Sequence, residues 1–475
     1  MLHSLLREKF ADKNIILLGF GVSNIPVARE FIAAGMGASV TVRDMKPFED
    51  LGDVARELSA AGVKFECGSE PTRDFACDTS HSVIFRSPGI RPDAGDLTAA
   101  IESGAILTSE VEFFCEHTPA RIIAITGSDG KTTTSTLTSL ILTEGYKGGK
   151  VYLGGNIGTP LFPLLDEIGE NDICVLELSS FQLMTMDSKA IHAAVTNITP
   201  NHLNWHIDMN EYAEAKYNVC GKKTERLVLN AADGYCRSLA TNTETPKIFF
   251  SAYRDNYSDL CAGISAKGIF LRGDEIIISD GESEETILHA SDIKLPGVHN
   301  IENYMTAIAL TYGIAEKDAA VRVAKTFGGV THRLEFVREK DGVKYYNSSI
   351  DSSPTRTIAA LSTFSNKPTL IIGGRGKKTP YIELAHELYI RAGAVILTGE
   401  TADEVSEALE SAKSAHPDSA LKIFREEDFQ KCVKLAESIT PAGSAVVLSP
   451  AATSFDKFKN FAERGEVFKN TVNSL

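Results

Sequence analysis

A glycine-rich segment at residues 126–133 (TGSDGKTT) lies between a hydrophobic strand pattern and a helical pattern. Glycines let backbone N–H groups gather around phosphate oxygens, and the N-terminus of the following helix adds positive potential. Lys131 can reach the β- and γ-phosphates of a nucleotide, and the Thr132 hydroxyl can ligate Mg²⁺. Two residues separate the glycines, where the common phosphate loop has four. The segment predicts a nucleotide phosphate site, and a structural turn with a solvated lysine is the alternative.

Candidate metal ligands follow two later strand patterns. Glu177 ends one of them, and a carboxylate at the carboxyl end of a parallel strand near a phosphate loop can hold Mg²⁺. The loop 197–206 (NITPNHLNWH) contains His202, His206 and the only tryptophan, Trp205. His202 can bind a metal or a phosphate, whereas His206 and Trp205 can simply pack. A surface or capping role for Glu177 and a structural role for His202 remain the alternatives.

Four further segments can bind charged groups. The turn 19–24 (GFGVSN) is similar to a dinucleotide fingerprint but has Asn at the third glycine position, so it can hold a phosphate, a uridine or no ligand at all. An arginine at 332–333 (HR) can move onto a γ-phosphate. The basic turn 373–378 (GGRGKK) suits a carboxylate or a phosphate, and 448–456 (LSPAATSFD) supplies hydroxyl groups at a strand end. Lys216, on a helical pattern, is by residue type alone a solvated charge.

Alternating strand and helix patterns predict where these loops lie. Strands are expected at 14–18, 39–42, 82–85, 121–126, 151–153, 172–177, 193–197, 343–346, 369–372, 394–397, 421–424 and 445–448, helices at 23–34, 131–144 and 301–313, and a β insertion within 245–295. Such alternation implies parallel pairing. We predict an α/β protein of three doubly wound domains in series: a Rossmann-like domain at 1–110, a central P-loop ATPase-like domain at 111–329 and a Rossmann-like domain at 330–475. Catalytic parts would meet in the clefts between them.

Composition narrows the class of protein. The chain has 475 residues, enough for about three domains. Its 48 basic and 63 acidic residues give a formal net charge of −15, which argues against a nucleic-acid or anionic-membrane binder because such proteins need a basic face. No apolar run approaches the roughly 18 residues of a membrane span, and the N-terminus is too charged for a secretory signal. The eight cysteines form no CxxC pair. We expect a cytoplasmic protein.

Together these segments resemble the Mur ligase family, the ATP-dependent amide-forming enzymes of peptidoglycan precursor assembly. The phosphate loop resembles the family's ATP loop, and four further blocks carry the resemblance: ELSSFQL (177–183), NITPNHLNWH with YAEAK (212–216), HRLE (332–335) and LSPAATSFDKFKNFAERG (448–465). These blocks span nearly the whole chain in the family's order. They are similar to the member that joins D-glutamate to UDP-N-acetylmuramoyl-L-alanine.

The resemblance implies a reaction in three steps. ATP phosphorylates the terminal carboxylate of UDP-N-acetylmuramoyl-L-alanine, the amine of D-glutamate attacks the acyl phosphate, and the tetrahedral intermediate expels phosphate. ATP and Mg²⁺ are the expected cofactors. No nucleic acid or membrane is an expected partner, and we expect a monomer.

The resemblance also implies roles for individual residues. The catalytic set is Lys131, Glu177, His202 and Lys216. The Mg²⁺ ligands are Thr132, Glu177, His202 and Lys216, the last as a carbamate. The ATP contacts are Gly127, Ser128, Asp129, Gly130, Lys131, Thr132, Thr133, Asn300, Asn303, Arg333 and Asp351. The contacts to the UDP substrate are Val22, Ser23, Arg43, Ser87, Pro88, Gly89 and Asn156. The D-glutamate contacts are Ser352, Lys377, Ser454, Phe455 and Phe461.

The chain departs from the family at a few positions. The family usually has Asn-Asp-Ser where this chain has Asn-Ser-Ser at 347–349, and Asp351 is the expected substitute for the missing acid at Ser348. Asn201 and Asn204 stand where acids are common. Three alternatives remain open: a sister ligase for another amino acid or a folate-type glutamate ligase, a non-catalytic nucleotide-binding regulator with the same fold, and a dehydrogenase.

Overall fold

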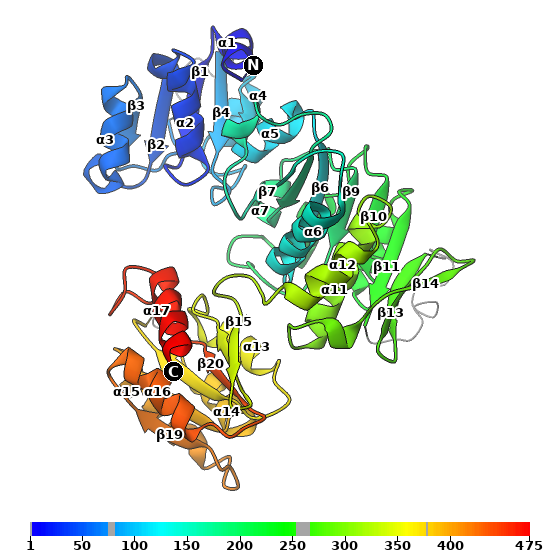
Figure 1. The fold of residues 1–475 in the computed structure, drawn as a ribbon. Coiled ribbons are helices and arrows are strands. Elements are labelled where there is room, and N and C mark those ends of the chain that lie inside the picture. The colour runs from blue at the N-terminus through cyan, green and yellow to red at the C-terminus, as the bar shows by residue number, and fades with distance from the viewer. Residues whose placement is uncertain (1, 75–80, 253–266, 377–378) are drawn as a thin grey trace. The chain divides into compact units, whose positions relative to one another are not determined.

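The computed structural model describes residues 2–74, 81–252, 267–376 and 379–475, and the strands in these ranges form three sheets (Figure 1). The chain divides into two compact units. One comprises Met1–His289 and Glu302–Val323 and contains the first two sheets; the other comprises Ala290–Ile301 and Ala324–Leu475 and contains the third. No helix in the described ranges is long and apolar enough to cross a membrane.

The first sheet is parallel throughout, in the order β3-β2-β1-β4-β5. Its strands are β1 (Asn14–Leu18), β2 (Val40–Asp44), β3 (Lys64–Cys67), β4 (Ser82–Arg86) and β5 (Ile106–Thr108), with helices α1 (Leu2–Phe10), α2 (Asn24–Ala33), α3 (Asp53–Ala60), α4 (Leu97–Glu102) and α5 (Glu110–His117). Alternate residues of β1 pack on opposite faces: Leu17 joins the large core under α1 and α2, and Leu18 joins a smaller core under α4. The strand order reverses between β1 and β4, so the loops after these strands flank the usual ligand crevice of such a sheet.

The second sheet has the order β14-β13-β12-β11-β10-β9-β6-β8-β7. Its strands are β6 (Arg121–Thr126), β7 (Val151–Gly155), β8 (Ile173–Glu177), β9 (His192–Val195), β10 (Arg226–Asn230), β11 (Lys247–Ser251), β12 (Gly268–Arg272), β13 (Glu275–Ser279) and β14 (Glu284–His289). Its helices are α6 (Lys131–Gly145), α7 (Ser180–Leu183), α8 (Met209–Tyr217), α9 (Gly234–Thr241), α11 (Val298–Thr311) and α12 (Asp318–Thr326). The strands predicted within 245–295 are present, but β12, β13 and β14 extend this sheet with antiparallel pairing at its end.

The third sheet has the order β15-β16-β20-β17-β18-β19, with only β15 antiparallel among the described strands. Its strands are β15 (Glu335–Lys340), β16 (Val343–Asn347), β17 (Thr369–Gly373), β18 (Ala394–Thr398), β19 (Lys422–Arg425) and β20 (Ala445–Leu448), with helices α13 (Pro354–Leu361), α14 (Ile382–Arg391), α15 (Ala402–Lys413), α16 (Phe429–Ile439) and α17 (Phe461–Ser474). Leu370 and Ile372 pack with α14 and α15, while Ile371 between them packs with α16 and α17. Helices therefore cover both faces.

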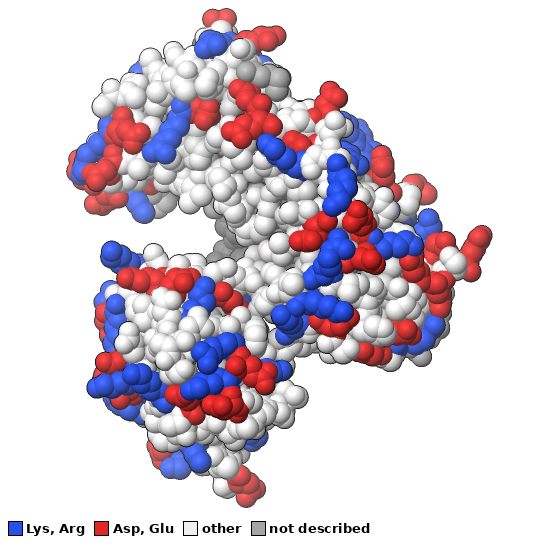
Figure 2. All heavy atoms as spheres, viewed as in Figure 1, with Lys and Arg blue, Asp and Glu red and all other residues white. Residues whose placement is uncertain are grey.

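Most predicted strands lie within a residue or two of their observed bounds, because they are continuous apolar runs buried on both faces. Four strands were not predicted: β3, β5, β10 and β15. Charges interrupt the sequences of β3 (KFEC) and β15 (EFVREK), which suits strands at sheet edges. On the face drawn in Figure 2, basic and acidic side chains are interspersed.

Candidate active site

The phosphate loop connects β6 to α6 and depends on two glycines. Gly127 has φ +146°, and a Cβ there would lie 1.9 Å from Thr196 Oγ1; Gly130 has φ +79°, and a Cβ there would lie 2.4 Å from Asn303 Oδ1. Side chains are excluded at both positions by conformation and by space. Lys131 begins α6, and its Nζ donates to the carbonyl oxygens of Gly127 and Ser128, both at 2.9 Å. The lysine thus lies over its own loop, at the N-terminus of a 15-residue helix.

Four neighbouring parallel strands bring the predicted catalytic segments to one edge. In the order β9-β6-β8-β7, Thr126 pairs with Val195, Ile125 pairs with Glu177, and Gly155 pairs with Glu177. Glu177 is the last residue of β8. Three further segments follow the carboxyl ends of the other strands: the phosphate loop, the loop 197–206 and Asn156. Their proximity is a result of strand order, since they are far apart in sequence.

Glu177 is buried, with 1% of its surface exposed. Its Oε1 accepts a 2.8 Å hydrogen bond from Asn156 Nδ2, and its Oε2 has no hydrogen-bond partner in the described structure. A buried carboxylate oxygen without a donor is costly unless a cation satisfies it. The residue therefore fits a metal ligand. Asn156, predicted to touch the UDP substrate, orients this carboxylate.

Lys216 is also 1% exposed, which rejects the solvated charge that its residue type alone suggests. Its Nζ donates to Gly127 O at 2.7 Å and lies 4.5 Å from the centre of the Tyr212 ring. Burial, followed by the positive charge of Lys131, holds the pKa of Lys216 well below its usual range. A neutral buried amine next to the phosphate loop is the form that can add CO₂ and become an anionic ligand.

The described residues contain no group of three or more His, Cys, Asp and Glu side chains placed to hold a metal. A Mg²⁺ ion at this edge would therefore need hydroxyl, phosphate or carbamate oxygens besides Glu177. Such oxygen donors are the ones that Mg²⁺ prefers. The donor set of Thr132, Glu177 and a carbamylated Lys216 fits the ion; His202 adds a nitrogen.

His202 and His206 have different environments. His202 is exposed, has φ +57°, and its ring lies 4.9 Å from that of Phe181; partial burial and the charges of Lys131 and Lys216 lower its pKa. His206 is 2% exposed and hydrogen-bonds through Nε2 to Ser180 Oγ at 2.9 Å and through Nδ1 to Glu211 Oε2 at 3.1 Å. His202 is thus available to a ligand, whereas His206 is held within the protein.

The predicted ATP contacts lie in both units. Asn303, on α11, accepts a hydrogen bond from Thr134 Oγ1 at 3.1 Å, next to the phosphate loop. Asn300 lies on the same helix, and its Nδ2 donates to Pro296 O at 2.6 Å. Arg333 stands between two residues of positive φ, His332 (+63°) and Leu334 (+42°).

Asp351, expected to replace the family's acid, is 6% exposed and accepts a 2.9 Å hydrogen bond from Ser449 Oγ. Burial raises its pKa to about 6. Its carboxylate is therefore engaged inside the third domain, and its role toward ATP stays a prediction.

Most of the predicted UDP contacts follow β1 and β4, while Arg43 lies in β2 and Asn156 follows β7. Val22 is 78% exposed at the tip of the first loop. Asn24, which replaces the third glycine of the fingerprint, is completely buried; its Nδ2 donates to Leu18 O and Gly19 O at 2.9 Å and to Ser87 Oγ at 3.2 Å. The asparagine thus joins the two loops. Arg43 donates to Glu66 Oε2 at 2.8 Å on the neighbouring strand.

The predicted D-glutamate contacts that the structure describes lie in the loops after β16 and β20 and at the start of α17, all in the third domain. Phe455 and Phe461 are 58% and 41% exposed, while Ser454 is buried. Ser352 follows β16. Lys377 lies outside the described residues.

One arginine that we did not predict organises these loops. Arg464, 1% exposed, donates through Nη2 to Ser349 O at 2.9 Å and Ala452 O at 3.1 Å, and through Nη1 to Thr453 O at 3.2 Å. Its Nε donates to Ser349 Oγ at 3.0 Å. Arg464 lies in the FAERG block at 461–465, which is part of the resemblance to the family. The sequence contains no other sign of its role, which is evident only from its tertiary contacts.

Comparison with known proteins identifies the family. Residues 125–311 match the Mur ligase middle domain, and residues 332–452 match the Mur ligase glutamate ligase domain. The chain is 41% identical over 472 residues to the UDP-N-acetylmuramoylalanine--D-glutamate ligase of Ruminiclostridium cellulolyticum, covering 99% of this chain and 98% of the relative. The chain belongs to the Mur ligase family. The UDP-N-acetylmuramoylalanine--D-glutamate ligase of Clostridium novyi is 42% identical to this chain, covering 99% of this chain and 98% of the relative.

Among solved structures, the Mur ligase fold is shared with MurF from Acinetobacter baumannii, with a TM-score of 0.59, 14% identity and coverage of 99% of this chain and 98% of that one. This similarity concerns the fold alone. The predicted α/β class with three domains is confirmed, as is the resemblance to the Mur ligases. The exact domain boundaries and the roles of individual site residues stay predictions.

Proposed function

We propose that this chain is an ATP-dependent ligase that adds D-glutamate to UDP-N-acetylmuramoyl-L-alanine in cytoplasmic peptidoglycan precursor synthesis, acting as a monomer. The observation that carries the proposal is the full-length similarity, 41% and 42%, to relatives named as D-glutamate ligases. The edge formed by Lys131, Glu177 and Lys216 supports it, because a non-catalytic nucleotide-binding protein would not need a buried lysine beside the phosphate loop.

The chemistry begins with two anions that repel each other. A carboxylate oxygen of the UDP substrate attacks the γ-phosphorus of ATP, the bond to the bridging oxygen breaks, and ADP leaves. Lys131, which now donates to two loop carbonyls, would turn onto the phosphates and neutralise charge. The amine of D-glutamate then attacks the acyl phosphate, loses a proton and displaces phosphate.

Thr132, Glu177, His202 and a carbamylated Lys216 would hold Mg²⁺. When bound, the ion would offset the negative charge of the phosphates and of the acyl phosphate. Asn156 would keep the Glu177 carboxylate in the orientation that such binding requires, since it occupies Oε1 and leaves Oε2 open. D-Glutamate would bind in the third domain. Its contacts would be the exposed Phe455 and Phe461, the buried Ser454, and Ser352 and Lys377.

The test is phosphate release from ATP in the presence of UDP-N-acetylmuramoyl-L-alanine, with D-glutamate compared with L-glutamate, L-lysine and diaminopimelate. Release that requires both the UDP substrate and D-glutamate is expected. Release with another amino acid would instead assign the chain to a sister ligase. ATP binding without release for any pair would contradict the proposal and favour a non-catalytic role.

A further inference from the structure

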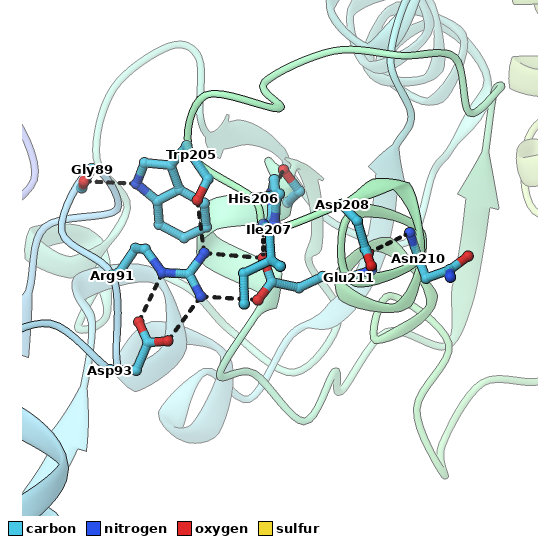
Figure 3. Close-up of polar contacts among 10 residues, drawn as sticks. Gly89, Arg91, Asp93, Trp205, His206, Ile207, Asp208, Asn210 and Glu211 are labelled. Carbon is cyan, nitrogen blue, oxygen red and sulfur yellow. Dashed lines mark hydrogen bonds and ion pairs between the residues drawn. The ribbon is translucent and has the colours of Figure 1, made fainter.

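Arg91 attaches the first domain to the loop that carries His202 (Figure 3). It follows β4 and the predicted UDP loop 87–89. Its Nη2 donates to Glu211 Oε1 at 2.9 Å, and its Nη1 donates to Glu211 Oε2 at 3.0 Å and to Trp205 O at 2.7 Å. Asp93 accepts from the Nε and Nη2 of the same guanidinium at 2.8 and 2.9 Å.

Glu211 connects Arg91 to two elements of the central domain. It lies in the first turn of α8, the helix that carries Lys216, and its Oε2 accepts a 2.9 Å hydrogen bond from Ile207 N. The same oxygen contacts His206 Nδ1 at 3.1 Å. The other ring nitrogen of His206 hydrogen-bonds to Ser180, which begins α7 three positions after Glu177. One carboxylate thus fixes both the end of the His202 loop and the start of α8.

Trp205 contacts the predicted UDP loop 87–89 directly. Its indole Nε1 donates to Gly89 O at 2.9 Å, and its ring lies 5.1 Å from the Arg91 guanidinium. Gly89 is one of the predicted contacts to the UDP substrate. A ligand that shifts this loop would therefore move Gly89 O, the hydrogen-bond partner of Trp205. Trp205 lies three positions after His202 in the same loop.

The adjacent Arg86 makes a second bridge in the same place. It is the last residue of β4 and is 1% exposed; it donates to Ile90 O at 2.6 Å in the loop that follows and to Phe181 O at 2.9 Å on α7. Phe181 in turn contacts the ring of Trp205 at 4.4 Å. The segment 86–91 is thus attached to the central domain at two points.

The Arg91–Glu211 pair suits a positioning role. Both side chains are only about one-fifth exposed, at 19% and 21%. A planar guanidinium that donates to both oxygens of one carboxylate sets a distance and an orientation, which a lysine cannot reproduce. The loop it holds needs such support, because His202 has the left-handed backbone conformation that residues with a Cβ seldom adopt.

We propose that Arg91 and Glu211 are positioning residues that couple the UDP-substrate loop to the His202 loop and to α8. Binding of the UDP substrate near Gly89 would then be transmitted through Trp205 and Arg91 to the groups that act in phosphoryl transfer. The proposal rests on the proposed function and adds to it a route by which ATP use depends on the UDP substrate.

The first test compares R91K and E211Q with the wild-type chain. Loss of a charge-assisted bidentate contact should lower kcat by about tenfold or more and raise the KM for the UDP substrate, while the KM for ATP stays unchanged. R29K, which alters an exposed arginine paired with Glu57 in the first domain, is the matched control and should behave as wild type. The R91K/E211Q double variant should lose no more than the worse single variant, because the two residues act as a unit.

The second test uses fluorescence, since Trp205 is the only tryptophan in the chain. Titration with UDP-N-acetylmuramoyl-L-alanine, and separately with UDP, should change the emission of the wild-type chain, and the change should be reduced in R91K at saturating ligand. The unfolding midpoint of each variant shows whether it is folded; R91M serves if R91K is not.

Wild-type kinetics and a wild-type fluorescence response in folded R91K and E211Q would overturn the coupling. An equal rise in the KM values of all three substrates would also overturn it, since that result indicates general damage. Failure of the proposed function has a different signature, namely a wild-type chain without D-glutamate-dependent phosphate release. The titration with UDP needs no turnover and remains informative in that case.

Discussion

The Nζ atom of Lys216 donates a 2.7 Å hydrogen bond to the carbonyl oxygen of Gly127, which also accepts from Lys131 Nζ at 2.9 Å. Two lysines therefore converge on one carbonyl of the phosphate loop, although they lie 85 positions apart in the sequence. Burial of Lys216 and the nearby positive charge of Lys131 both lower the pKa of Lys216 and so favour its neutral form. This relationship links the helix α8 to the nucleotide site and underlies the first two predictions.

Replacing Lys216 with alanine should abolish ligase activity, and short carboxylic acids such as acetate or formate should restore part of it. The cavity left by the side chain lies beside the phosphate loop, where an added carboxylate can take the place of a carbamate. Phosphate release with increasing acid concentration measures the rescue. Wild-type rates in K216A without added acid would remove Lys216 from the site.

Replacing Lys131 with alanine should lower kcat/KM for ATP by roughly 100-fold or more, because a charge on the transferred phosphoryl group loses its partner. Binding of the UDP substrate, measured by calorimetry, should be retained, since all of its predicted contacts except Asn156 lie in the first domain. Normal turnover in K131A would contradict the assignment of the phosphate loop.

Gly127→Ala should destabilise the chain and impair ATP use. The new Cβ would lie 1.9 Å from Thr196 Oγ1, which donates to Asp129 O at 2.6 Å within the loop. The strained backbone alone costs about 1–3 kcal/mol. Gly234→Ala is the matched control, because its Cβ would meet its nearest atom at 3.8 Å. Thermal unfolding and the KM for ATP are the measurements, and equal behaviour of the two variants would refute the role of Gly127.

Arg464→Met should lower the free energy of unfolding by roughly 3 kcal/mol or more and raise the KM for D-glutamate. The change leaves the buried carbonyls of Ser349 and Ala452 without their donor, whereas Thr453 O keeps the hydrogen bond from Arg375 N. These carbonyls belong to loops that carry predicted D-glutamate contacts. Lys459→Met, at an exposed position nearby, should change neither quantity. Denaturant unfolding and amino-acid titrations distinguish the two variants.

Glu110→Gln should stabilise the chain at alkaline pH relative to wild type. Burial raises the pKa of Glu110 to about 7 from an ordinary value of 4.5. The contribution of this carboxyl to stability is thus present below pH 4.5 and is lost as the pH rises toward 7, because the folded state resists ionisation. Between pH 5 and pH 8 the advantage of the variant should grow by about 2–3 kcal/mol. Unfolding at both pH values, with the exposed Glu102→Gln as control, measures it; a pH-independent difference would refute the argument.

Local chemistry made much of the site predictable. Glu177 ends a continuous apolar strand, and the phosphate loop and the His202 loop each follow one, so the sequence located all three at strand ends within a residue or two. Residue types also pointed correctly to the packing of His206 and Trp205, since both are at least half-buried. The residue type of Lys216 favoured solvent, and only the resemblance to the family placed it in the site.

The sequence by itself determined the chemical groups, the parallel α/β class and the family, because these depend on local patterns and short blocks. The tertiary structure alone decided which groups meet. Strand order puts β8 and β9 on either side of β6, so Glu177 and the His202 loop flank the phosphate loop. Arg91, Glu211 and Arg464 were missed because a solvated surface charge and a hydrogen-bonded charge that is partly or fully buried have the same residue type. What distinguishes these three residues from surface charges is their long-range contacts. Arg91 contacts Glu211 across 120 positions of the chain, and Arg464 contacts Gly373 O across 91, and no local pattern encodes such contacts.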